Sequence, residues 1–164
     1  MLFRSHWLFN LPAAKIDVVI HPQSLIHSMV QYKDGSIISQ MGPSDMRVPI
    51  SSVLGWPKRI ASNVTPLDLL QNSALNFMPL DENRFKCFKL AKLALEQGGY
   101  YPCVLNAANE IAVSLFLKKK IGFLQIGDMV ESALNEFSTT LTIDTIDNIV
   151  EIDRMARLLS ATLG

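Results

Sequence analysis

The character of the sequence changes at Asp81, and this change limits the folds open to the chain. Beyond it, apolar residues recur at helical spacing in several stretches that glycines or turn residues separate. This spacing predicts helices over residues 82–97, 107–120 and 128–137, with one or two more over 143–163. Helices this short cannot bury their apolar stripes separately, so we expect them to pack as a small bundle.

Polar residues at the expected helix ends fit this bundle. Asp81 and Asn106 are residue types that cap helix N-termini, and we expect them to cap the first two helices. The conspicuous Asn106-Ala107-Ala108-Asn109-Glu110 segment is interpreted as a helix start, with Glu110 near the positive end of the helix dipole. The Lys118-Lys119-Lys120 run is interpreted as a solvated helix C-terminus.

Before Asp81 the sequence favours strands and turns. Residues 16–20 form a short β-branched run, which is typical of a strand. A hairpin is expected from residues 26–33 and 36–41, because Asp34-Gly35 suits a two-residue type I′ loop with positive φ at both positions.

This two-residue loop fixes the expected pairing of the hairpin. Tyr32 lies opposite Ile37 in that register, and Val30 lies opposite Ser39. A lone hairpin is marginally stable, so it should join a larger sheet or pair with another chain.

A helix is expected over residues 46–54, and a linker follows it. Residues 56–80 contain three prolines and no long periodic pattern, so they are interpreted as extended chain with a short helix at 66–70. The fold class is therefore α+β, with a strand and a β-hairpin, a linker, and a small C-terminal α-helical bundle. The expected parts are residues 1–55, 56–80 and 81–164.

Composition limits the partners and the compartment. Hydrophobic residues make up 49% of the chain and charged residues 18%, so the chain can bury a core. The formal net charge is zero, which argues against nucleic acid as a partner. No apolar run approaches a membrane span, and the start lacks a secretory signal, so the cytoplasm is expected. Cys87 and Cys103 are interpreted as reduced, partly buried thiols.

A search for catalytic motifs finds little. The chain has no glycine-rich dinucleotide loop, no P-loop and no Gly-x-Ser-x-Gly elbow. His21 and His27 are the titratable candidates, although a partly buried, hydrogen-bonded sheet residue is the favoured interpretation of each. Met46 is a candidate for lining a ligand pocket, or else a gap-filler in a core.

Several distinctive strings occur in one order along the chain. They are Ile20-His21-Pro22-Gln23-Ser24-Leu25-Ile26-His27-Ser28-Met29-Val30, Asp45-Met46-Arg47-x-Pro49-Ile50, Trp56-Pro57, Pro66-Leu67-Asp68 and Leu105-Asn106-Ala107-Ala108-Asn109-Glu110. Together with His6-Trp7-Leu8-Phe9, they resemble the C-terminal portion of the 1-deoxy-D-xylulose 5-phosphate reductoisomerases, from about Trp7 to the chain end.

The resemblance implies a reaction and its cofactors. The family converts 1-deoxy-D-xylulose 5-phosphate to 2-C-methyl-D-erythritol 4-phosphate in the non-mevalonate route to isoprenoids. Mg²⁺ or Mn²⁺ holds the sugar-phosphate substrate, and NADPH delivers a hydride. Family members are homodimers with an NADPH domain, a catalytic and dimerisation domain, and a helical bundle. Residues 1–55 then correspond to part of the catalytic and dimerisation region.

The same resemblance implies that much of the active site lies outside this chain. The family's metal ligands precede the matched region, so no metal-binding residue is carried over, and neither the metal nor NADPH is expected to bind this chain tightly. His27 matches a histidine that approaches the active site, and Met46 matches a methionine near the nicotinamide. Ser44 departs from the usual proline, which puts close cofactor packing there in doubt.

Two functions remain open at this stage. The chain is either the C-terminal fragment of the enzyme, inactive until the missing N-terminal part is supplied, or a non-catalytic module for dimerisation or docking. An exposed hairpin edge makes the second plausible, because unpaired strand edges add further strands.

Overall fold

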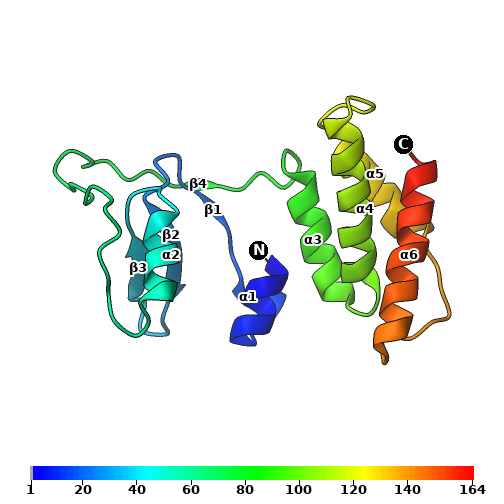
Figure 1. Cartoon of the computed structure of the whole chain (residues 1–164), viewed down its shortest axis with the longest axis horizontal. Helices are drawn as coiled ribbons and strands as arrows, with labels where there is room; N and C mark the ends of the chain where they lie inside the picture. The colour runs from blue at the N-terminus through cyan, green and yellow to red at the C-terminus, as the bar shows by residue number, and fades with distance from the viewer. Residues whose placement is uncertain (1) are drawn as a thin grey trace. The chain divides into compact units, whose positions relative to one another are not determined.

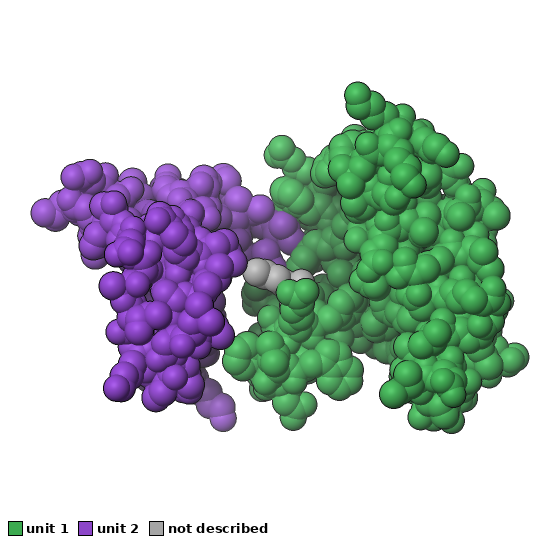
Figure 2. All heavy atoms as spheres, in the orientation of Figure 1, with its two compact units in different colours: residues 1–17, 81–164 green, residues 18–80 purple. Residues whose placement is uncertain are grey.

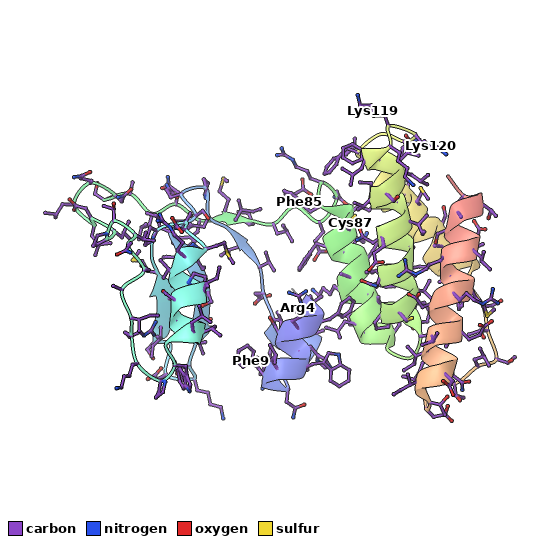
Figure 3. All side chains as sticks on the ribbon, in the orientation of Figure 1. Arg4, Phe9, Phe85, Cys87, Lys119 and Lys120 are labelled. Carbon is purple, nitrogen blue, oxygen red and sulfur yellow. The ribbon has the colours of Figure 1, made fainter. Side chains whose placement is uncertain are left out.

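A computed structural model describes residues 2–164, which form two compact units. One unit contains residues 18–80, and the other combines residues up to 17 with residues 81–164 (Figure 2). Helices and short antiparallel strands are both present, so the expected α+β class is confirmed. The expected functional division at residues 1–55, 56–80 and 81–164 stays a prediction. None of the described helices is long and apolar enough to cross a membrane.

The helical unit contains the expected bundle and a short N-terminal helix. Its elements are α1 (Leu2–Phe9), the 3₁₀ turn η1 (Ala13–Lys15), α3 (Lys86–Gln97), α4 (Tyr101–Leu117), α5 (Gln125–Glu136) and α6 (Ile146–Thr162) (Figure 1). Helix α4 packs against α3, α5 and α6, while α1 contacts α3. The segment before residue 18 therefore packs with the bundle, an association that no local pattern indicated.

Small side chains let α4 approach its neighbours closely. Ala107, Ala108 and Ala112 are completely buried on α4, and the larger Val104 and Ile152 fill the space beside them. Apolar burial of this kind is the main stabilising term of a small bundle. The alanines of the conspicuous Asn106–Glu110 segment thus belong to the core.

Two predicted caps are placed differently in the structure. Helix α4 begins at Tyr101, five residues before Asn106, so Asn106 lies inside the helix and donates to the Glu110 carboxylate at 3.1 Å. The reason lies at Gly98 and Gly99, both with positive φ, which reverse the chain and let α4 begin at once, with proline in its first turn. Asp81 accepts from two backbone N–H groups of a turn that precedes α3, which begins at Lys86.

The other unit is built from two small sheets and one helix. Strand β1 (Val19–Ile20) pairs with β4 (Met78–Pro79), and β2 (Ile26–Gln31) pairs with β3 (Ile37–Met41), both antiparallel. Helix α2 (Arg47–Leu54) follows the hairpin. The segment expected to be a short helix at 66–70 instead forms turns, in which Asp68 accepts from the Leu70 N–H at 2.9 Å.

The hairpin forms where expected, but its predicted register is wrong by one residue. Ile37 pairs with Gln31, and Ser39 pairs with Met29. The loop has three residues, because the Tyr32 N–H donates to the Ser36 carbonyl at 2.9 Å and the Gly35 N–H donates to the Tyr32 carbonyl at 3.1 Å. Only Gly35 of this loop has positive φ, at +87°, so the connection is a turn closed by a glycine bulge.

Candidate functional site

The candidate site is organised around the backbone carbonyl of Ser24. Ser24 has φ of +52°, and its N–H donates to the His21 carbonyl at 3.0 Å. Its carbonyl accepts from His27 Nε2 at 2.9 Å and also from the Ser44 hydroxyl. One oxygen atom therefore joins the turn before β2 to the segment that leads into α2.

His27 lies at an irregularity in the hairpin. Ile26 pairs with Met41 and Ser28 pairs with Gln40, so His27 is the extra residue of a β-bulge. Bulges redirect side chains, and His27 is exposed on the surface of its unit. A carbonyl only accepts, so Nε2 carries the proton in the neutral ring and Nδ1 is left as an acceptor.

Met46 is presented at the start of α2. Its side chain is 71% exposed, so the interpretation of Met46 as a core gap-filler is wrong. The preceding Asp45 accepts from the Arg47 backbone N–H at 2.8 Å and from its guanidinium at 2.7 Å. The side-chain hydrogen bond of Arg47 is the main reason that the pKa of Asp45 falls from 3.8 to about 2. This ion pair fixes the turn from which Met46 projects.

His21 has a different environment from His27. His21 Nδ1 donates to the Asn76 carbonyl at 2.8 Å, and its ring stacks on Phe77 with centroids 4.9 Å apart. The Gln23 side chain accepts from the Asn76 N–H at 3.3 Å. These contacts tie the turn at residues 21–24 to the two residues just before β4, and they fit the partly buried, hydrogen-bonded interpretation of His21.

A hollow of about 580 Å³ lies beside the shared carbonyl. Leu25 and Ser44 line it, together with residues 65–68, Gln71 and Asn72. Half of the lining side chains are neutral and polar, so they can accept and donate hydrogen bonds. No sequence pattern indicated this hollow, because its walls come from three separate segments of the chain, residues 23–25, 43–44 and 65–72.

The described residues do not fit a divalent metal ion. Among residues 2–164, no three histidine, cysteine or acidic side chains come close enough to hold one. Cys87 and Cys103 are free thiols in the helical unit, and burial raises the pKa of both. The residues present therefore offer a histidine, an apolar methionine and polar hollow walls, without a ligand set for Mg²⁺.

Comparison with known proteins identifies the class. The family model described as "DXP reductoisomerase C-terminal domain" matches residues 41–159. The region from the end of β3 through most of α6 thus matches the C-terminal domain of a reductoisomerase.

Individual relatives agree with this class. The 1-deoxy-D-xylulose 5-phosphate reductoisomerase of Chlorobium chlorochromatii is 49% identical over 156 residues, covering 95% of this chain and 41% of the relative. That of Pseudomonas aeruginosa strain UCBPP-PA14 is 47% identical, with 95% and 39% covered. The chain therefore spans about two fifths of the length of these curated relatives.

Solved structures give the same answer. The Zymomonas mobilis reductoisomerase in complex with NADPH superposes with a TM-score of 0.90 at 43% identity, covering 99% of this chain and 43% of that one. A DOX-P reductoisomerase complex with NADPH, fosmidomycin and magnesium gives 0.92 at 38% identity, covering 98% and 41%. The chain belongs to the 1-deoxy-D-xylulose 5-phosphate reductoisomerase family.

Proposed function

We propose that this chain acts as the C-terminal part of a 1-deoxy-D-xylulose 5-phosphate reductoisomerase, to which it contributes His27 and Met46. The Ser24 carbonyl carries the proposal, since it links the bulge that presents His27 to the segment that presents Met46. His27 on the hairpin and Met46 at the start of α2 are thereby held on backbone segments that are hydrogen-bonded to each other, as an active site requires.

The roles of the two residues follow from their chemistry. With Nε2 committed to the Ser24 carbonyl, His27 offers Nδ1 to accept a hydrogen bond or a proton from a bound substrate. The exposed Met46 thioether offers a flexible apolar contact of the kind that packs against an aromatic ring such as nicotinamide.

The remaining parts of the reaction are assigned to the missing N-terminal part of the enzyme. A divalent metal, Mg²⁺ or Mn²⁺, would polarise and orient the sugar-phosphate substrate, and NADPH would supply hydride. The described residues provide neither a metal ligand set nor a glycine-rich phosphate loop. We place the assembled enzyme in the cytoplasm, where free thiols such as Cys87 and Cys103 stay reduced.

Large apolar side chains on both units support an assembly with further protein. In the helical unit Trp7 and Leu8 are each 77% exposed, and in the hairpin unit Leu54 and Trp56 are 78% and 79% exposed. Exposed apolar groups of this size mark protein interaction surfaces. The proposed occupants are the N-terminal part of the enzyme and the second subunit of a homodimer.

The test is a complementation assay. NADPH oxidation is measured with 1-deoxy-D-xylulose 5-phosphate and Mn²⁺, using this chain, the N-terminal part of the Chlorobium chlorochromatii relative, and their mixture. Activity is expected in the mixture alone. His27→Gln should lower kcat of the mixture roughly a hundredfold or more, the range for loss of a general acid or base. Glu151→Gln, on α6 of the helical unit, should leave the rate unchanged.

Each other result has a defined meaning. Turnover by the isolated chain would contradict the assignment of the metal site to the missing part. An inactive mixture in which the two parts nevertheless bind one another would favour the second candidate, a docking module. The exposed edges of the β2–β3 hairpin favour that candidate, because no third strand pairs with them among the described residues.

A further inference from the structure

The conformation of Ser24 needs an explanation beyond its own sequence. Serine has no intrinsic preference for positive φ, which glycine and asparagine adopt more readily. Surrounding hydrogen bonds must therefore stabilise the turn. One of them is internal, from the Ser24 N–H to the His21 carbonyl, and two reach the Ser24 carbonyl from outside the turn.

Ser44 makes the side-chain bond that closes this arrangement. The hydroxyl has a single proton, and it is donated to the Ser24 carbonyl. A backbone bond runs beside it, from the Gly42 N–H to the Leu25 carbonyl at 2.9 Å. Among the hydrogen bonds of the described residues, Ser44 supplies the one side-chain link between residues 42–46 and residues 21–27.

The shared acceptor couples Ser44 to His27. Both lone pairs of the Ser24 carbonyl are used, one by the His27 ring and one by the Ser44 hydroxyl. Without the Ser44 hydrogen bond, the turn at residues 21–24 is no longer tied to the segment before α2. The Ser24 carbonyl, which orients the His27 ring, is then no longer fixed in position. Side-chain networks of this kind depend on every member.

We propose that Ser44 is a positioning residue, which orients His27 by anchoring the Ser24 carbonyl to the start of α2. Its catalytic consequence rests on the proposed function above, while its effect on the turn does not. Ser44 touches neither substrate nor cofactor in this scheme. It acts through the orientation of the His27 ring and through the connection to the Met46 segment.

The first measurement needs no activity. Backbone ¹⁵N order parameters of residues 21–27 are compared in the wild-type chain, Ser44→Ala and Ser44→Thr. Wild type and Ser44→Thr should give values of about 0.85, as for rigid backbone, whereas Ser44→Ala should fall toward about 0.6 at Ser24 and Leu25. Residues 146–162 of α6 provide the internal control and should not change. Equal order in all three chains would overturn the proposal.

The second measurement is a double-mutant cycle in the complemented assay. Ser44→Ala should lower kcat about two- to tenfold, the range expected from one hydrogen bond, and Ser44→Thr should restore it. In a His27→Gln background, Ser44→Ala should lower kcat little further, because the imidazole ring that Ser44 positions is absent. Equal effects in both backgrounds would show that Ser44 does not act through His27. A mixture that is inactive with the wild-type chain would reject the proposed function, and the order parameters would still decide the role of Ser44 in the turn.

Discussion

Arg157 on α6 donates to Glu110 on α4, with Nη2 and Oε2 2.7 Å apart across 47 residues of sequence. The same guanidinium donates to Asp153 one turn earlier on α6, at 2.6 Å. Asn106 completes the group by donating to the other oxygen of Glu110. The conspicuous Asn106–Glu110 segment therefore has two structural roles, since its alanines fill the core and its polar ends tie α4 to α6.

Acid should weaken this tie. Hydrogen bonds from Arg157, and then from Asn106, hold the pKa of Glu110 below its ordinary value of 4.5. A lowered folded-state pKa means that the stabilisation is present above about pH 4.5 and is lost as pH falls through the folded value. The free energy of unfolding of Glu110→Gln should therefore fall less between pH 5 and pH 3 than that of wild type, as measured by urea denaturation.

A variant that removes an ion pair within one helix serves as the control for Glu110→Gln. Glu151→Gln removes an ion pair within α6 alone, to Arg154 at 2.7 Å. The two variants should differ, because the Glu110 pair joins two helices and the Glu151 pair does not. Glu110 is half exposed, so the effect at neutral pH should be small and should shrink in high salt. A pH dependence identical to that of wild type would contradict this account.

Truncation of the bundle core should have a much larger effect. Ile152 is completely buried between α4 and α6, so Ile152→Ala should reduce the free energy of unfolding by about 2–5 kcal/mol. Ile146, on the same helix, is 79% exposed, and Ile146→Ala should change the free energy of unfolding by less than about 0.5 kcal/mol. Circular dichroism during urea titration measures both. Similar losses for the two variants would mean that α6 does not pack as described.

The hairpin loop makes a prediction of its own. Gly35 has φ of +87°, and a Cβ there would meet no neighbouring atom, so the penalty of Gly35→Ala comes from backbone conformation alone. The variant should destabilise the hairpin by about 1–2 kcal/mol. Lys33→Ala, in the same loop but without positive φ, should be nearly neutral. Amide hydrogen exchange of residues 26–41 distinguishes them, and equal protection in both variants would argue against the glycine bulge.

Limited proteolysis should distinguish the segment without regular secondary structure from the folded helical bundle. Residues 57–77 lack helix and strand, and Lys58 and Arg59 are exposed within them. Trypsin should cut first at these two positions and leave residues 60–164, which contain the helical bundle, as a protected product. Lys92, inside α3, is paired with Glu82 at 3.9 Å and should be cut much later. Mass spectrometry of early products checks the order, and early cleavage at Lys92 would contradict a folded α3.

Local patterns predicted the helices because each apolar stripe repeats over several turns. They placed the start of α4 wrongly, because Asn106 has a capping preference, whereas Gly98, Gly99 and Pro102 start the helix at Tyr101. They also predicted the wrong hairpin loop. Asp-Gly occurs in loops of two and of three residues, and backbone geometry decides between them.

The roles of the candidate site residues stay a prediction, and their arrangement was not predictable from the sequence. His27 and Met46 were found through family motifs, and their exposure could not be anticipated from hydrophobic pattern. A serine at position 24 does not indicate positive φ. The two hydrogen bonds that its carbonyl accepts could therefore not be predicted before the fold was known. Strand β4 was not predicted, because it has only two residues and lies in a proline-containing segment. It is a strand only through its pairing with β1, in which Met78 lies opposite Ile20, 58 residues earlier.

The β1–β4 pairing brings the first and last residues of the hairpin unit together. Val19 and Pro79 are partners, so the polypeptide leaves the helical unit and returns to it through two adjacent extended segments. Residues 18–80 are thus an insert whose two ends pair with each other, and within the helical unit α1 packs against α3. Domains with neighbouring ends tolerate excision and transplantation. The hairpin unit could therefore be exchanged between relatives as a cassette, and a short glycine linker in its place would leave the helical unit continuous.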